Sequence, residues 1–247
     1  MRIIAKLDIK QSQLIKSIRY DGVRKLGELK NYLRKYLNYD FDEMVFLNST
    51  GSLYNTKINY LLLNEMNSLC NFPISAGGGI RCLDDANKLI FSGCDKIIIN
   101  TLIHENPHEA KKIINTFGSA SVVGSIQYRE EDSKLKTYHT MARVKTKYDL
   151  YECINFFEEI GVGEIILNNI DYDGKISGID ENSKLLEIIY EKKNIPFLIN
   201  GGFKSFDQIK KYNKIFSGII ISSALHFDKI GLRDVKNFKK FIDEDIL

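Results

Sequence analysis

Two segments, Pro73-Ile-Ser-Ala-Gly-Gly-Gly79-Ile-Arg81 and Pro196-Phe-Leu-Ile-Asn-Gly-Gly202-Phe-Lys-Ser205, share one plan and lie about half a chain apart. Each is a short apolar run that ends in glycines and precedes a helical pattern. Glycine lets backbone N–H groups approach an anion closely, and a following helix N-terminus favours negative charge. The pair therefore predicts two phosphate sites and a ligand with a phosphate at each end. The alternative is that the glycines only form tight turns.

Apolar runs of strand length alternate with helix-period segments, which is typical of βα units around a parallel sheet. We expect strands at residues 2–8, 43–48, 73–76, 96–100, 121–127, 164–168, 196–200 and 218–222. We expect helices at residues 59–70, 83–92, 107–117, 150–160, 184–191, 206–212 and 233–245. Eight such units in 247 residues predict an α/β protein with a single (β/α)8 TIM barrel. A doubly wound open sheet is the alternative, but eight consecutive units without an antiparallel break favour closure.

The strand ends of the two halves match. The first strand ends in Asp8 and the fifth in Gln127, while the second and sixth end in Asn48 and Asn168. The fourth ends in Asn100-Thr101 and the eighth in Ser222-Ser223. The chain is therefore interpreted as one domain, residues 1–247, built from two similar half-barrels of about 1–120 and 121–247.

The composition excludes several classes of protein. An apolar fraction of 44%, a charged fraction of 27% and a net charge of +3 are ordinary for a globular protein and give no argument for nucleic acid. No apolar run is long enough to span a membrane, and charges interrupt the N-terminal stretch, so we expect a cytoplasmic protein. The four cysteines form no C-x-x-C pair, so we expect free thiols and neither a metal nor a cofactor.

The active face of a TIM barrel lies at the C-terminal ends of its strands, where small hydroxyls, amides and N–H groups suit a phosphate and a carboxylate suits acid–base work. Asp8 follows Lys6 by two residues, so both side chains point to one side of the strand. If that side is the barrel interior, Lys6 lowers the pKa of Asp8 and keeps it ionised. The alternative is a charge pair that only fixes the strand end.

The opposite face has a charged residue at the start of four strands, namely Arg2, Glu43, Lys96 and Glu164. Such charges are commonly a solvated rim. Four of alternating sign can instead form a ring of ion pairs that closes the barrel bottom and acts as a gate.

Taken together, these residues resemble the cyclase subunit of imidazole glycerol phosphate synthase, the family usually called HisF. The resemblance covers the whole chain and is carried by Leu7-Asp8-Ile9-Lys10, Val45-Phe46-Leu47, Gly77-Gly78-Gly79-Ile80-Arg81, Asp95-Lys96-Ile97, Ile99-Asn100, Gly163-Glu164-Ile165-Ile166-Leu167, Asp171-Tyr172-Asp173-Gly174 and His226-Phe227. It implies a (β/α)8 barrel that binds a HisH-like glutaminase partner at its bottom. Ammonia from that partner would travel up the barrel to a bisphosphorylated ribulosyl-formimino-carboxamide ribotide, which is split and cyclised to imidazole glycerol phosphate in histidine biosynthesis.

The resemblance also implies roles for single residues. The ammonia gate corresponds to Arg2, Glu43, Lys96 and Glu164. Phosphate-binding residues correspond to Gly79, Asn100 and Thr101 at one end and to Asp173, Gly174, Gly202, Ser222 and Ser223 at the other. Lys16 corresponds to the lysine that the family associates with its first active-site loop, and the loop itself corresponds to about residues 20–27. Asp8 corresponds to the first catalytic aspartate.

Several positions depart from the family pattern. Where the family has its second catalytic aspartate, this chain has Gln127, whose side chain cannot exchange a proton near pH 7. At the tip of the second strand the family has an aspartate, and this chain has Asn48, which we keep among the substrate-binding residues. Before Leu-Asp the family usually has a small residue, and this chain has Lys6. The family's Gly-Gly-Arg-Lys turn is Met141-Ala142-Arg143-Val144.

Four hypotheses follow from this pattern. The chain is a HisF-type synthase subunit, with Asp8 as the acid–base group and Gln127 positioning the substrate. Alternatively, it is a HisF-like paralogue that passes ammonia from a glutaminase to a sugar amidotransferase in surface-glycan biosynthesis. A single-chain sugar-phosphate isomerase of the related HisA kind is disfavoured by Gln127 and by the four-charge ring. The last is a catalytically silent barrel that only activates a glutaminase.

Overall fold

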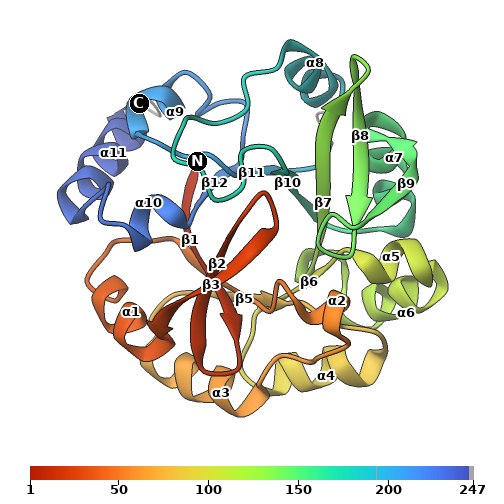
Figure 1. Cartoon of the computed structure of the whole chain (residues 1–247), viewed down its shortest axis with the longest axis horizontal. Helices are drawn as coiled ribbons and strands as arrows, with labels where there is room; N and C mark the ends of the chain where they lie inside the picture. The colour runs from red at the N-terminus through yellow and green to blue at the C-terminus, as the bar shows by residue number, and fades with distance from the viewer. Residues whose placement is uncertain (193, 245–247) are drawn as a thin grey trace.

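Eight parallel strands close into a barrel in the computed structural model, which describes residues 1–192 and 194–244 (Figure 1). They are β1 (Arg2–Lys10), β4 (Glu43–Leu47), β5 (Ile74–Gly77), β6 (Lys96–Ile99), β7 (Val122–Glu131), β10 (Glu164–Asn169), β11 (Phe197–Asn200) and β12 (Gly218–Ile221). Each of these strands pairs with the next, and β12 pairs in parallel with β1, so the eight-stranded barrel is closed. The predicted (β/α)8 barrel is confirmed, and the open-sheet alternative is excluded.

Helices surround the barrel on its outer side (Figure 1). They are α1 (Leu29–Tyr36), α2 (Gly51–Tyr54), α3 (Tyr60–Leu69), α4 (Leu83–Phe91), α5 (Thr101–Glu105), α6 (Pro107–Phe117), α7 (Leu150–Ile160), α8 (Ser183–Glu191), α9 (Phe206–Lys210), α10 (Ser223–His226) and α11 (Leu232–Glu244). All seven expected helices occur with ends within two residues of the expectation, except that Asp245 lies outside the described residues. The short helices α2, α5 and α10 and the helix α1 were not expected.

Two antiparallel hairpins interrupt the βα pattern, so the expectation of eight units without an antiparallel break is wrong. The first is β2 (Gln13–Ile18) with β3 (Asp21–Glu28), which projects over the centre of the ring in Figure 1. The second is β8 (Lys134–His139) with β9 (Val144–Asp149). Both follow the first strand of a proposed half-barrel, at equivalent places. The division into two halves stays a prediction, as does the single domain of residues 1–247, whose last three residues lie outside the described ones.

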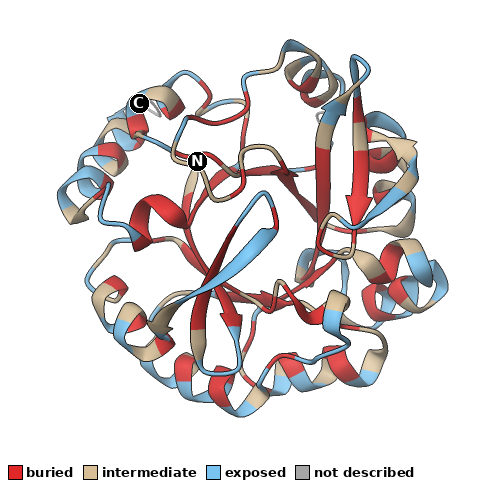
Figure 2. Ribbon diagram, in the orientation of Figure 1, coloured by how far each residue is buried: buried red, intermediate tan, exposed pale blue. Residues whose placement is uncertain are grey.

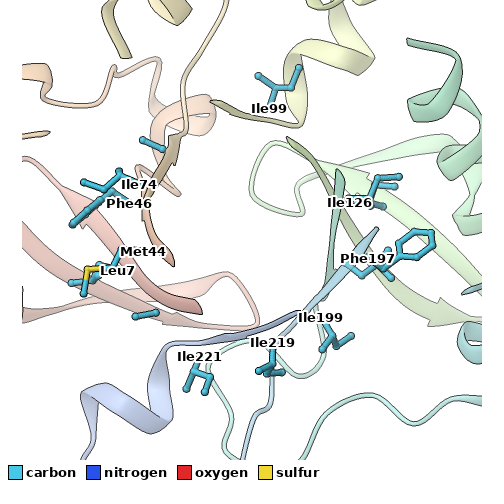
Figure 3. Close-up of a cluster of buried hydrophobic side chains, with 14 of the residues drawn as sticks. Leu7, Met44, Phe46, Ile74, Ile99, Ile126, Phe197, Ile199, Ile219 and Ile221 are labelled. Carbon is cyan, nitrogen blue, oxygen red and sulfur yellow. The ribbon is translucent and has the colours of Figure 1, made fainter. Parts of the chain in front are cut away.

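The side chains of the barrel strands alternate between an outer and an inner face. On β1, Ile3, Ala5 and Leu7 point outward and join the core between strands and helices. Figure 3 shows this outward layer around the ring, and Figure 2 shows that the strands are buried while the helices expose one face. The other face of the strands forms a smaller interior ring, made of Ile4, Val45, Ile98, Val123, Ile166, Leu198 and Ile220.

Local signals in the sequence set the helix ends. Asp149 accepts a hydrogen bond from the N–H of Glu152, whose side chain accepts one in return, and this capping box starts α7. Gly161 ends α7 in the left-handed conformation. Among the described residues, no helix is both long and apolar enough to cross a bilayer. All four cysteines are free, as expected.

Candidate functional site

Four charged side chains form a buried network at the C-terminal mouth of the barrel. The Lys6 ammonium lies 3.1 Å from Asp8 Oδ1, and Lys16 Nζ donates to Asp8 Oδ2 at 3.0 Å. Lys16 also donates to Asp173 Oδ1 at 3.1 Å, which ties the β2–β3 hairpin to the segment after β10. Asp173 Oδ2 accepts from the Ser17 hydroxyl and from the Tyr20 N–H. The network holds two cations and two anions, so its charges balance.

The network fixes the protonation state of Asp8. Burial opposes the charge of this carboxyl, but the ammonium groups of Lys16 and Lys6 outweigh burial and lower its pKa to about 2. Burial likewise opposes the charge of Lys16, and Asp173 and Asp8 raise the pKa of Lys16 despite it. Asp8 is therefore an anion throughout the physiological range. The expectation that Lys6 shares a side with Asp8 and lowers its pKa is confirmed.

The first glycine segment forms a small pocket of about 50 Å³ at this mouth. Gly78 and Gly79 have φ of +95° and +78°, and a Cβ on Gly79 would overlap the carbonyl oxygen of Thr56, so the turn requires glycine. The pocket wall also contains Asn100 and Thr101. Asn100 Oδ1 is buried and has no hydrogen-bond partner among the described residues, which leaves it free for a ligand donor.

Asn48 stands beside this first pocket at the end of β4. Its Oδ1 accepts from the Thr50 hydroxyl at 3.2 Å, and its Nδ2 approaches Thr56 at 3.4 Å. The amide thus supports the loop that encloses the glycines, while its side chain still contributes to the pocket wall.

The second glycine segment forms a pocket of about 10 Å³ on the same rim. Its wall consists of Lys16, Asp173, Gly174, Lys175, Asn200, Gly201, Gly202, Phe203, Ile220, Ser222, Ser223 and Ala224. Ser222 is held by His226 Nε2 at 3.1 Å, while His226 Nδ1 meets the Tyr36 hydroxyl at 2.7 Å. Burial and the nearby Lys16 lower the pKa of His226 to about 3, so this ring is neutral and orients Ser222.

Gln127 lies at the wall of the first pocket and contacts a turn rather than the charged network. Its Oε1 accepts a hydrogen bond of 2.7 Å from the backbone N–H of Ala142. The neighbouring residue Met141 is buried with Tyr20, Tyr138 and Ile170 in an apolar cluster over the mouth. Tyr20 and Met141 also border an outer cavity of about 540 Å³.

The opposite end of the barrel carries the ring of charges. Arg2 binds Glu43 at 2.7 Å and also binds Glu164, while Lys96 lies 3.3 Å from Glu43 and 3.2 Å from Glu164. Ser75 donates to Glu43 as well. Both carboxylates are buried, so the four residues form a closed ring of alternating charge instead of a loose solvated rim. The role of the ring as a gate stays a prediction.

The structure thus groups the expected residues into two pockets on one rim, a central charged network and a ring at the far end. The sequence analysis did not find Tyr138 or the outer cavity, and it included Tyr20 only as the start of the first active-site loop, because the two hairpins meet over the mouth through tertiary contacts that no local pattern indicates. Among the described residues, no group of three or more His, Cys, Asp or Glu side chains could hold a metal ion.

Known proteins resemble this chain over nearly its whole length. Residues 2–231 match the model of a family described as histidine biosynthesis protein. The imidazole glycerol phosphate synthase subunit HisF of Pyrococcus furiosus is 32% identical over 96% of this chain and 94% of its own. The protein of the same name from Dictyoglomus thermophilum is 32% identical over 97% and 95%. That of Lactococcus lactis subsp. cremoris is 33% identical over 95% and 92%.

Proposed function

This chain belongs to the histidine biosynthesis protein family and, within it, to the HisF subunits, and on that premise we propose that it is the cyclase subunit of an imidazole glycerol phosphate synthase. It uses ammonia from a partner glutaminase to convert the bisphosphorylated ribulosyl-formimino-carboxamide ribotide to imidazole glycerol phosphate. One observation carries the proposal: two glycine pockets share the mouth of a barrel whose other end is closed by a four-charge ring.

The two pockets hold the two phosphates of the substrate. At one end, Gly79 offers its backbone N–H, and Asn100 and Thr101 offer an amide and a hydroxyl. At the other end, Gly202 offers its backbone N–H, and Ser222 and Ser223 offer hydroxyl groups beside the Lys16 ammonium. Gly174 closes that pocket, and Asp173 keeps Lys16 in place.

Asp8 is the acid–base group of the reaction. At rest it is a fixed anion between two ammonium groups, which makes it a poor proton acceptor. A phosphate dianion in the second pocket shares Lys16 with Asp8 and adds negative charge nearby. Both effects raise the pKa of Asp8 toward the range in which it can accept a proton, so substrate binding itself activates the carboxylate.

Ammonia enters at the bottom and passes the ring of Arg2, Glu43, Lys96 and Glu164. Above the ring lies the interior aliphatic layer, which a neutral molecule crosses more easily than an ion. The glutaminase partner docks on the same end of the barrel, so its product is released next to the ring.

The second candidate is a HisF-like paralogue that passes ammonia to a sugar amidotransferase. Gln127 favours it, because this side chain has no proton to exchange near pH 7 and its oxygen is engaged by Ala142. Under this hypothesis the bottom ring and the partner are retained, and the mouth no longer performs the cyclisation.

Turnover of the bisphosphorylated substrate with free ammonium at high pH separates the two candidates. The cyclase hypothesis expects turnover that Asp8→Asn reduces at least about 100-fold, the usual cost of losing an acid–base group. The matched control is Asp84→Asn, which changes an exposed carboxyl on α4 and should leave turnover unchanged. Substrate binding without turnover in the unmodified protein would instead favour the paralogue.

The partner is tested separately by co-elution with HisH-like glutaminases. Complex formation at micromolar concentration supports both candidates. A monomeric profile with every glutaminase tried would contradict both, whatever the fate of the substrate assay.

A further inference from the structure

Three consecutive residues in the turn between β8 and β9 adopt the left-handed conformation without a glycine among them. Thr140, Met141 and Ala142 have φ of 51°, 57° and 58°. L-residues visit this region singly and at a cost, because Cβ approaches the carbonyl oxygen. A run of three persists only where the surroundings hold it in place, and such strain collects at clamps and switches.

Two hydrogen bonds pin this turn to the first phosphate pocket. The N–H of Ala142 donates to Gln127 Oε1 at 2.7 Å, and the N–H of Thr140 donates to Thr101 Oγ1 at 3.2 Å. Gln127 and Thr101 both line that pocket. The strained turn is therefore fastened to the residues that would touch a bound phosphate.

Between the two pinned residues, Met141 is inserted into the barrel mouth. Its side chain is buried against Tyr20, Tyr138 and Ile170. Met141 and Tyr20 border both the inner pocket of about 50 Å³ and the outer cavity of about 540 Å³. These two side chains thus form the partition between the outer cavity and the pocket.

We propose that the 140–142 turn is a lid on the first pocket, that a phosphate bound at Thr101 holds the lid shut, and that Gln127 is the positioning residue that aligns it. The proposal rests on the proposed function in one respect, namely that the first pocket binds phosphate. In this proposal Gln127, which occupies the position of the family's second aspartate, aligns the lid through a hydrogen bond and transfers no proton.

The hydroxyl of Thr101 couples the ligand to the lid. A hydroxyl has one proton and two lone pairs, so Thr101 can donate to a phosphate while it accepts from Thr140. A charged acceptor polarises the hydroxyl and strengthens the bond that it receives. Backbone strain favours opening and the bound anion favours closure, so the turn has two states that a ligand can shift.

The length of Gln127 matters for this task. An aspartate or asparagine is one methylene shorter and would leave its oxygen out of reach of the Ala142 N–H, whereas a glutamate keeps both the length and the acceptor. Gln127→Glu should therefore preserve the closed turn, and Gln127→Ala should release it.

Amide hydrogen exchange measured by NMR on the full chain tests the lid, with inorganic phosphate as the probe. Saturating phosphate should slow the exchange of the Thr140 and Ala142 amides by about tenfold, the equivalent of one hydrogen bond. Gln127→Ala should speed the Ala142 exchange by about tenfold, and Gln127→Glu should restore the slow rate. The control is Gln208→Ala, which removes a comparable bond from the Ile179 N–H, at 3.0 Å, outside the lid. Its Ala142 exchange should match that of the unmodified chain.

Two results would overturn the lid. In the first, phosphate shifts the NMR resonances of Gly79 and Asn100, but the Thr140 and Ala142 amides exchange at unchanged rates. This result would support the phosphate site and refute the lid. In the second, Gln127→Ala leaves the Ala142 rate unchanged, which removes the positioning role. If phosphate moves no resonance in the first pocket, the phosphate assignment of the proposed function fails and the lid fails with it.

Discussion

Replacing Asp8 by asparagine tests the charged network at the barrel mouth through the stability of the fold. The pKa of this carboxyl is about 2 in the folded chain, against an ordinary value of 3.8. At 1.36 kcal/mol per pKa unit, the difference gives the folded state about 2 kcal/mol at neutral pH. Because folding lowers the pKa, the unfolded chain takes up the proton first as the pH falls. The contribution is complete above the ordinary pKa and is lost as the pH drops through the folded value.

Asparagine is close in shape to a protonated aspartic acid, so Asp8→Asn removes this contribution. Lys6 and Lys16 then face a neutral side chain, as they do when Asp8 is protonated at low pH. Urea unfolding followed by circular dichroism at pH 7 should show the variant to be less stable by about 2 kcal/mol. The deficit should shrink to about 1 kcal/mol at pH 3, since roughly half of the linkage is lost there. Carboxyls outside the charged network have the same surroundings in both proteins, so their contributions cancel in the difference.

A solvent-exposed aspartate provides the comparison. Asp84 pairs with Lys88 on the surface of α4, and Asp84→Asn should cost less than about 1 kcal/mol at pH 7. An Asp8→Asn deficit that is the same at pH 7 and pH 3 would show that the carboxyl is not held between two ammonium groups, and the account of the mouth would be refuted.

Three further predictions concern other parts of the chain. Glu164→Gln removes the carboxylate that Arg2 and Lys96 share, so glutamine-driven turnover in the complex should fall severalfold while ammonium-driven turnover is kept; equal losses would contradict a gate. Gly202→Ala should weaken phosphate binding in the second pocket at least about tenfold, because its Cβ would overlap the carbonyl of Gly178, whereas Gly22→Ala, also at positive φ but in open space, should not. Ala142→Gly should stabilise the fold by about 0.5–1 kcal/mol in urea unfolding, because glycine relieves the left-handed strain and keeps the N–H; destabilisation would show that the turn is unstrained.

The barrel itself was predictable because its strands are continuous apolar runs that end in polar residues. Buried parallel strands have this character, and the sequence therefore located all eight to within a few residues. The pair of Lys6 and Asp8 was also predictable, since a spacing of two places both side chains on one side of a strand.

The hairpins were not predictable by the same route. Most of β3 is exposed, so it shows no alternation of buried and exposed positions that would mark a strand. The contact between Lys16 and Asp173 joins residues 157 positions apart, and nothing local in the sequence indicates it. The left-handed turn at Met141 is equally hidden, because its conformation depends on bonds to Gln127 and Thr101 and not on a glycine.

The aliphatic layer in the barrel interior has a consequence for the chemistry at the mouth. Ile4, Val45, Ile166 and their neighbours offer no hydrogen-bond partner to water, so a file of water molecules across this layer would be poorly solvated. In the proposed cyclisation, intermediates formed above the layer would then be shielded from water that enters through the floor. Under the proposed function, a neutral ammonia molecule would cross this layer at a smaller desolvation cost than an ammonium ion, so the layer would insulate the mouth from ions and bulk solvent on that side.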